Sequence, residues 1–239
     1  ARSAAGVRLY SIASPSPGVS PKMTDYSRWT LVHQVRDQAA ALGERVFITF
    51  GDGSPDLTYA AFDRRSDAVA AALVAREVGK DDRVMLLVKN RAEFLIAMIG
   101  IMKCGALFVP INTELRGAFL QHQLRNCEPK LVICDAFDGV DAAGTEPQNL
   151  IVIAGDLPAA LPPALAPAKV EDWEAFEASG AGLSSPDFEP TKDTIAGIMY
   201  TSGTTGPAKG VLLPHGHMYL FGVGSNGATG LTAADVYYV

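Results

Sequence analysis

The feature that most constrains the fold of this chain is a nearly unbroken apolar segment, RVMLLVK, at residues 83–89. A strand that is apolar on both faces is buried on both faces, which is usual in parallel sheets covered by helices. Apolar residues also recur at the spacing of one helix face along Leu31–Leu42 and along Tyr59–Val78. The sequence therefore predicts an α/β protein with mostly parallel sheets and flanking helices in alternating order.

The alternation of strand and helix continues along the chain. Further helices are predicted at about residues 91–103, 114–126 and 172–178, and further strands at residues 45–50, 106–110, 130–134 and 149–154. This order is that of βαβ units. Residues 157–169 hold four prolines and are interpreted as a surface loop. The acidic passage 135–193 is interpreted as an insertion over the sheet, because strand signals lie inside it.

Composition narrows the functional classes. Hydrophobic residues make up 48% of the chain and charged residues 19%, as in globular proteins, and no apolar run reaches a length that spans a membrane. A net charge of −6 argues against nucleic acid as the main partner, since that requires a concentrated basic face. The chain has three cysteines, Cys104, Cys127 and Cys134. Their spacing does not suit a zinc site or a redox pair, and an odd number argues against a disulfide framework. A reducing, cytoplasmic location is therefore expected.

The stretch that carries chemistry is Thr201–Gly210 (TSGTTGPAKG), which lies between predicted strands at Asp193–Tyr200 and Val211–Leu213. It combines three glycines, four hydroxyl side chains and one lysine. Glycines permit a turn whose backbone amides converge on an anion. The hydroxyls add short donors and Lys209 adds a mobile positive charge. Together they predict a site for a polyphosphate.

Two alternatives apply to this stretch. A plain turn between two strands would explain the glycines, but neither the lysine beyond Gly206 nor four hydroxyls in five positions. The Walker phosphate loop, G-x-x-x-x-G-K-[ST] before a helix, is a closer rival. The chain fails that pattern, because Ala208 precedes Lys209 and Gly210 follows it.

Two histidines, His215 and His217, follow closely in the sequence PHGH. Three roles stay open for them: a metal pair, a structural contact or helix start, and a part in shaping the nucleotide pocket. A metal pair lacks a visible third ligand, and Pro214 interrupts the regular strand that would point both rings to one face. Elsewhere, Arg91 and Glu93 are interpreted as solvated, and the residues Trp29 and Trp173 as packing residues.

The segment Ile198–Lys209 (IMYTSGTTGPAK) resembles the AMP-binding signature of the adenylate-forming superfamily, which comprises acyl-CoA synthetases, luciferases and peptide-synthetase adenylation domains. Two upstream stretches resemble further motifs of the superfamily in the expected order: Leu57–Tyr59, which opens a helix, and Met102–Asn112 (MKCGALFVPIN), where Cys104 replaces the common alanine. The resemblance implies the fold of the first half of the large N-terminal domain of an acyl-CoA synthetase.

The same resemblance implies an AMP-forming acid–thiol ligase. A carboxylate attacks the α-phosphate of ATP to give acyl-AMP and pyrophosphate, and a thiol, commonly that of coenzyme A, then displaces AMP. Lys209 would be the catalytic residue, and Thr204 would hold Mg²⁺. The residues implied to bind the β- and γ-phosphates are Thr201, Ser202, Gly203, Thr204, Thr205, Gly206 and Lys209. The alternative is a non-catalytic nucleotide- or anion-binding module that has kept this loop.

The ends of the chain carry expectations of their own. Residues 1–22, which lack acidic residues, are predicted to be a flexible leader or tag, with a transit-type leader as the alternative. Residues 23–239 are predicted to be an incomplete AMP-binding domain, because the later motifs of the superfamily are missing. We therefore expect the chain alone to be inactive and its partner to be the C-terminal remainder of the same protein. Open strand edges would suit that remainder or a second copy, as in a homodimer.

Overall fold

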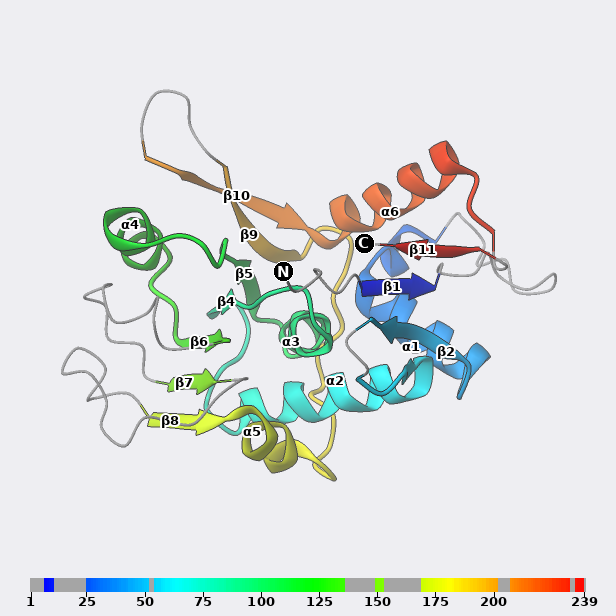
Figure 1. Ribbon diagram of the computed structural model, residues 1–239, viewed down its shortest axis with the longest axis horizontal. Coiled ribbons are helices and arrows are strands. Elements are labelled where there is room, and N and C mark those ends of the chain that lie inside the picture. Colours follow the sequence, from blue (N-terminus) through cyan, green and yellow to red (C-terminus); the bar gives the residue numbers. More distant parts are fainter. Residues whose placement is uncertain are drawn as a thin grey trace.

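The computed structural model describes residues 7–10, 25–51, 54–135, 149–152, 169–201, 207–232 and 235–238. Its larger sheet has the strand order β10-β9-β5-β4-β6-β7-β8 (Figure 1). The bounds are β4 Arg83–Leu87, β5 Leu107–Pro110, β6 Leu131–Cys134, β7 Asn149–Val152, β8 Lys169–Asp172, β9 Ile195–Thr201 and β10 Lys209–Pro214. All neighbours in it are parallel except β9 and β10. The predicted mostly parallel sheet is therefore confirmed.

The smaller, second sheet is antiparallel, which the sequence did not predict. It has the order β11-β1-β2-β3, with β1 Val7–Tyr10, β2 Val46–Phe50, β3 Leu57–Thr58 and β11 Val236–Tyr238, and its neighbours are antiparallel. Figure 1 shows β1 and β11 side by side although they come from opposite ends of the sequence. β1 falls within residues 1–22, so part of that segment is paired. The interpretation of residues 1–22 as a leader or tag stays a prediction.

Six α-helices are described, together with a short 3₁₀ helix at Tyr26–Arg28. They are α1 Leu31–Leu42, α2 Tyr59–Val74, α3 Ala92–Lys103, α4 Gly117–Cys127, α5 Trp173–Gly180 and α6 His215–Thr229. Thr30 and Thr58 cap α1 and α2, because each hydroxyl accepts a hydrogen bond from the backbone N–H three residues on. None of the helices in the described part of the chain has both the length and the apolar character that a bilayer span requires.

Two predicted helices are shorter than expected, for local reasons. α2 ends at Val74 rather than Val78 because Glu77 takes a left-handed φ of 61°, and the Val78 N–H then donates to the Leu73 carbonyl at 3.0 Å. α4 begins at Gly117 rather than near residue 114. There the Asn112 carbonyl and side chain accept hydrogen bonds from the following backbone and hold a turn. The proline-rich residues 157–168 lie outside the described residues, and Lys169 opens β8.

The central strand β4 supplies two separate cores. Val84 and Leu86 point into a core that they share with α2 and α3. Met85 and Leu87 point into a second core with α4. Successive side chains of a strand face opposite sides of the sheet, so a strand between two helical layers must be apolar at every position. This explains the apolar run at residues 83–89.

A buried lysine joins α2 to α3. The Lys103 side chain has no exposed surface, and its ammonium nitrogen Nζ lies 2.6 Å from Asp63 Oδ1, 2.7 Å from Asp67 Oδ1 and 3.0 Å from the Asp63 carbonyl. The three donors of the ammonium therefore meet three acceptors. Close packing one turn earlier supports this junction, because a Cβ on Gly100 would lie 2.6 Å from Val69 Cγ1. Lys103, part of the second motif, thus has a structural position.

Candidate functional site

The predicted phosphate-binding stretch forms the connection of a β-hairpin. β9 and β10 pair in antiparallel register with Lys209 opposite Thr201, so the two ends of the predicted loop are held side by side. The residues Ser202, Gly203, Thr204, Thr205 and Gly206 lie outside the described residues. The strands predicted on each side are confirmed, and β10 extends over Lys209–Pro214.

The hairpin lies at the carboxyl end of the parallel strands. β9 runs parallel to β5, with Gly197 opposite Phe108, and β5 runs parallel to β4. A Cβ on Gly197 would collide with the Phe108 carbonyl, so a glycine is needed for this close approach. Thr201 therefore lies at the edge where the parallel strands end. In open α/β sheets ligands bind outside this edge.

Lys209 offers a free positive charge at this edge. Its side chain is exposed at the first position of β10, and in the described part of the chain it forms no ion pair. The Thr201 hydroxyl is also at the surface and lies 3.4 Å from the Lys209 carbonyl. An ammonium that forms no ion pair with the described residues can bind phosphate oxygens without first breaking a salt bridge to them.

Helix α4 contacts the β9–β10 hairpin at Tyr200 in β9 and at Ala208 just before β10. His122 Nε2 lies 2.9 Å from the Ala208 carbonyl, and the Tyr200 hydroxyl donates to Asn126 Oδ1 at 2.6 Å. Burial raises the pKa of Tyr200 to about 12, so its hydroxyl keeps its proton. A hollow of about 720 Å³ lies between these elements. It is lined by Pro110, Asn112, Leu115, Ala118, Phe119, His122, Gln123, Tyr200, Thr201, Pro207 and Ala208.

The base of the hairpin is closed by the start of α6. The backbone N–H groups of His215 and Gly216 donate to the carbonyls of Thr194 and Lys192 at 2.9 and 2.8 Å. The His215 side chain is buried, and its Nδ1 has no hydrogen-bond partner among the described residues. Burial, with a smaller contribution from nearby His33, lowers the pKa of His215 to about 4, so the ring is neutral at pH 7.

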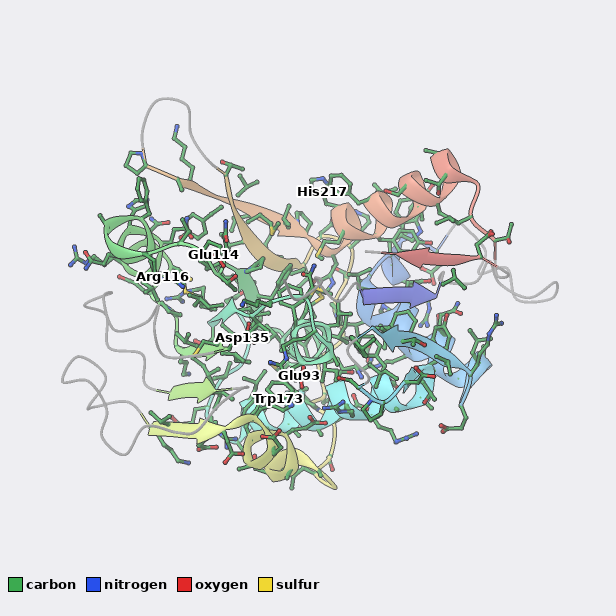
Figure 2. The ribbon with its side chains drawn as sticks, viewed as in Figure 1. Glu93, Glu114, Arg116, Asp135, Trp173 and His217 are labelled. Carbon is green, nitrogen blue, oxygen red and sulfur yellow. The ribbon has the colours of Figure 1, made fainter. Side chains whose placement is uncertain are left out.

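The two histidines of PHGH are not a metal pair. His217 (labelled in Figure 2) is exposed on α6 and stacks on Phe221 with ring centroids 4.8 Å apart. His215 is buried. Among the described ranges, no group of three or more His, Cys, Asp or Glu side chains is arranged to hold a metal ion. Of the three roles left open, a structural contact and helix start fits His215.

Arg91 and Glu93 were expected to be solvated, which is wrong for Glu93, while a third of the Arg91 side chain is exposed. The Arg91 guanidinium binds Glu93 at 2.7 Å and Asp135 at 3.2 Å, and both carboxylates are largely buried. Figure 2 labels these two acids. Asp135 also accepts a hydrogen bond from the backbone N–H of Lys89 at 2.7 Å. These contacts join the loops that follow β4 and β6. Arg91 is therefore engaged in structure at the carboxyl edge.

The remaining predictions about single residues concern packing. Trp173 is buried in the main core and donates to Glu177 at 2.9 Å, and Trp29 stacks on Tyr219. All three cysteines are free and buried. Burial raises the pKa of Cys104 to about 11 and those of the other two to about 12. None of them is a thiolate at neutral pH, so none is a ready nucleophile.

Similarity to known proteins covers most of the chain. Residues 35–239 match the family model of the AMP-binding enzymes. A medium/long-chain-fatty-acid–CoA ligase of Mycobacterium tuberculosis is 34% identical over 198 residues, which are 82% of this chain and 31% of that protein. A medium/long-chain-fatty-acid–CoA/3-oxocholest-4-en-26-oate–CoA ligase of Mycolicibacterium smegmatis is 32% identical over 197 residues, with 77% and 34% covered. The chain thus spans about a third of the length of these relatives.

Solved structures share the fold. A fatty acyl CoA synthetase of Mycobacterium tuberculosis superposes with a TM-score of 0.61 at 26% identity, over 80% of this chain and 36% of that one. The o-succinylbenzoate CoA synthetase of Bacillus subtilis, in complex with its acyl-adenylate intermediate, gives 0.61 at 23% identity over 83% and 46%. The expected N-terminal acyl-CoA synthetase fold is therefore confirmed. Because the family match includes the β9–β10 hairpin and most of the chain, this chain belongs to the family of AMP-binding enzymes.

Proposed function

We propose that this chain is the phosphate-binding part of an AMP-forming acid–thiol ligase, which converts a carboxylate, ATP and coenzyme A to an acyl-CoA thioester, AMP and pyrophosphate. The observation that carries the proposal is the position of Lys209, exposed, unpaired within the described residues, and opposite Thr201 at the carboxyl edge. The fatty-acid–CoA ligases among the relatives support a carboxylic acid as the substrate.

In the first step a carboxylate oxygen attacks the α-phosphorus of ATP, and the bond to the β-phosphate oxygen breaks. Both electrons of that bond leave with pyrophosphate, which gains negative charge. Lys209, Thr201 and the donors of residues 202–206 would hold the β- and γ-phosphates and stabilise this charge. In the second step the coenzyme A thiol loses its proton to water, its sulfur attacks the acyl carbon, and AMP departs with the electrons of the carbon–oxygen bond.

Mg²⁺ is expected to accompany the phosphates. It prefers oxygen ligands and commonly binds phosphates together with one or two protein oxygens. The protein ligand that the resemblance to the superfamily implies, and that we propose, is the Thr204 hydroxyl. The residues that the structure describes hold no group of three or more His, Cys, Asp or Glu side chains that could bind the ion by itself. When bound, the ion would neutralise phosphate charge.

Further parts of the protein belong to the same proposal. The relatives are about three times as long as the matched region, which supports a C-terminal remainder that completes the adenine and acyl pockets. We expect the chain alone to be inactive, with that remainder or a second copy on its open strand edges. Three free thiols fit a reducing, cytoplasmic location.

The test is product analysis with the full-length protein, ATP, coenzyme A and a panel of carboxylic acids. AMP and pyrophosphate should appear only with a suitable acid. Release of ADP and phosphate would refute the proposal and indicate a kinase or ATPase. Binding of MgATP without any acid-dependent product would instead support the non-catalytic nucleotide-binding module.

A further inference from the structure

Helix α4 contacts both limbs of the β9–β10 hairpin at the residues that adjoin the phosphate loop. On the rising limb, the Tyr200 hydroxyl donates to Asn126 Oδ1 at 2.6 Å. On the descending limb, His122 Nε2 lies 2.9 Å from the Ala208 carbonyl. His122 and Asn126 are four residues apart, so they lie on one face of the helix. A single rigid element therefore reaches both ends of the loop.

The contact with Ala208 bears on Lys209 directly. A carbonyl oxygen only accepts hydrogen bonds, so His122 Nε2 carries the hydrogen and donates it. The Ala208 carbonyl belongs to the planar peptide unit that contains the backbone nitrogen of Lys209. This peptide plane also contains the Cα atom of Lys209. A hydrogen bond that holds the Ala208 carbonyl therefore restricts the direction in which the Lys209 side chain points. On the opposite limb Tyr200 precedes Thr201, and there Asn126 holds the side-chain hydroxyl of Tyr200 and not a backbone carbonyl.

Helix α4 is firmly anchored on its far side. Leu120 and Leu124 are fully buried in the second core. At the end of the helix, the Arg83 guanidinium donates to the carbonyls of Cys127 and Glu128, both at 2.9 Å. The helix is thus held to β4, and its bonds to the hairpin tie the loop to the centre of the sheet.

We propose that His122 and Asn126 are positioning residues, which hold Ala208 and Tyr200 so that Lys209 and Thr201 meet the phosphates of a nucleotide. The inference rests on the proposed function, because it assumes that this loop binds MgATP. It assigns to α4 a role in affinity for phosphates and none in binding the carboxylic acid.

The first test uses two amides of different reach at position 122. Glutamine places its amide nitrogen near the position of His122 Nε2, whereas asparagine is too short to reach the Ala208 carbonyl. In the full-length protein we expect His122→Asn to weaken MgATP binding by about tenfold, the size of one lost hydrogen bond, while His122→Gln stays close to wild type. Binding is measured by calorimetry. Arg125→Gln, on the exposed face of the same helix, should have no effect.

The second test separates positioning from loss of fold. In pyrophosphate exchange, His122→Asn should raise the KM for MgATP and for pyrophosphate and leave the KM for the acid unchanged. Tyr200→Phe, which removes only the hydroxyl bound to Asn126, should act in the same direction. A merely structural role would lower the active fraction and the melting temperature and leave every KM unchanged, and that result would overturn the inference.

The two proposals fail differently. If wild-type protein binds MgATP but shows no acid-dependent exchange, the ligase function fails, and the binding comparison of His122→Gln with His122→Asn still decides the role of α4. If wild type catalyses exchange and both variants bind MgATP as wild type does, the positioning role is wrong and the ligase function stands. Absence of MgATP binding by wild type would refute both.

Discussion

Replacing Lys103 by methionine should destabilise the protein more than any change at the surface. The ammonium is fully buried and makes three contacts of 2.6–3.0 Å with α2. Methionine has a similar volume and fills the same space, so the change removes the charge with little effect on packing. It leaves the carboxylates of Asp63 and Asp67 facing each other without a cation.

The magnitude follows from the exposure of the two acids. Removing one partner of a fully buried ion pair costs about 3–5 kcal/mol, because the remaining charge stays desolvated. Here the side chains of Asp63 and Asp67 are 23% and 36% exposed, so water can reach both once the ammonium is gone. We therefore expect the lower end of that range, about 3 kcal/mol.

The assay is urea denaturation of wild type and Lys103→Met at pH 7, with stability taken from the midpoint at equal m-values. A second variant adds Asp63→Asn and Asp67→Asn to Lys103→Met. Because it removes the unpaired charges as well as the cation, it should recover at least half of the loss. A loss below 0.5 kcal/mol (on the order of a typical surface change) for Lys103→Met would refute the reasoning, as would a triple variant less stable than the single one.

Three further predictions concern the hairpin and its base. Lys209→Ala should lower acid-dependent pyrophosphate exchange by about 10² to 10³ in the full-length protein, as expected for a lost donor to a developing charge, and a loss below about threefold would contradict its catalytic role. Gly216→Ala should destabilise the protein by roughly 1–2 kcal/mol in urea denaturation, because its Cβ would lie 3.0 Å from both the side chain and the carbonyl of Lys192. Gly222→Ala, in the same helix with nothing within 4 Å, should stabilise it by up to about 1 kcal/mol, and equal effects at the two sites would argue against close packing at the base. His215 has a pKa of about 4 when folded and a reference value of 6.5. The unfolded chain therefore binds more protons between these values, and stability should fall by up to about 3 kcal/mol as the pH drops from 6.5 to 4. His215→Asn should flatten that part of the pH dependence, and an unchanged slope would show that other groups cause it.

Local signals in the sequence predict most of the larger sheet and its helices. The apolar run at residues 83–89 indicates a strand between two helical layers, and the helix predicted at Leu31–Leu42 has the bounds that are observed. The second sheet escapes such reasoning, because β1 and β11 are short and pair across more than two hundred residues. No local periodicity records a pairing of that kind.

The candidate site, too, has a part that the sequence predicts and a part that it does not. The composition of residues 201–210 predicts phosphate binding, and the strand register places Lys209 opposite Thr201. Motif analysis cannot find the contacts between α4 and the hairpin, because His122 lies 86 residues from Ala208 in the sequence. Its only signal in the sequence is that His122 and Asn126 share a helix face, which any solvated pair would also do.

Because successive side chains of β4 enter two different cores, a substitution in this strand affects only one of the two cores directly. Met85 and Leu87 support the layer beneath α4, while Val84 and Leu86 support the opposite layer. A substitution at Met85 or Leu87 therefore changes the packing beneath α4 and leaves the side chains between α2 and α3 unchanged. Related proteins can therefore differ at the face of β4 that supports α4 and the hairpin, while the core between β4, α2 and α3 stays the same.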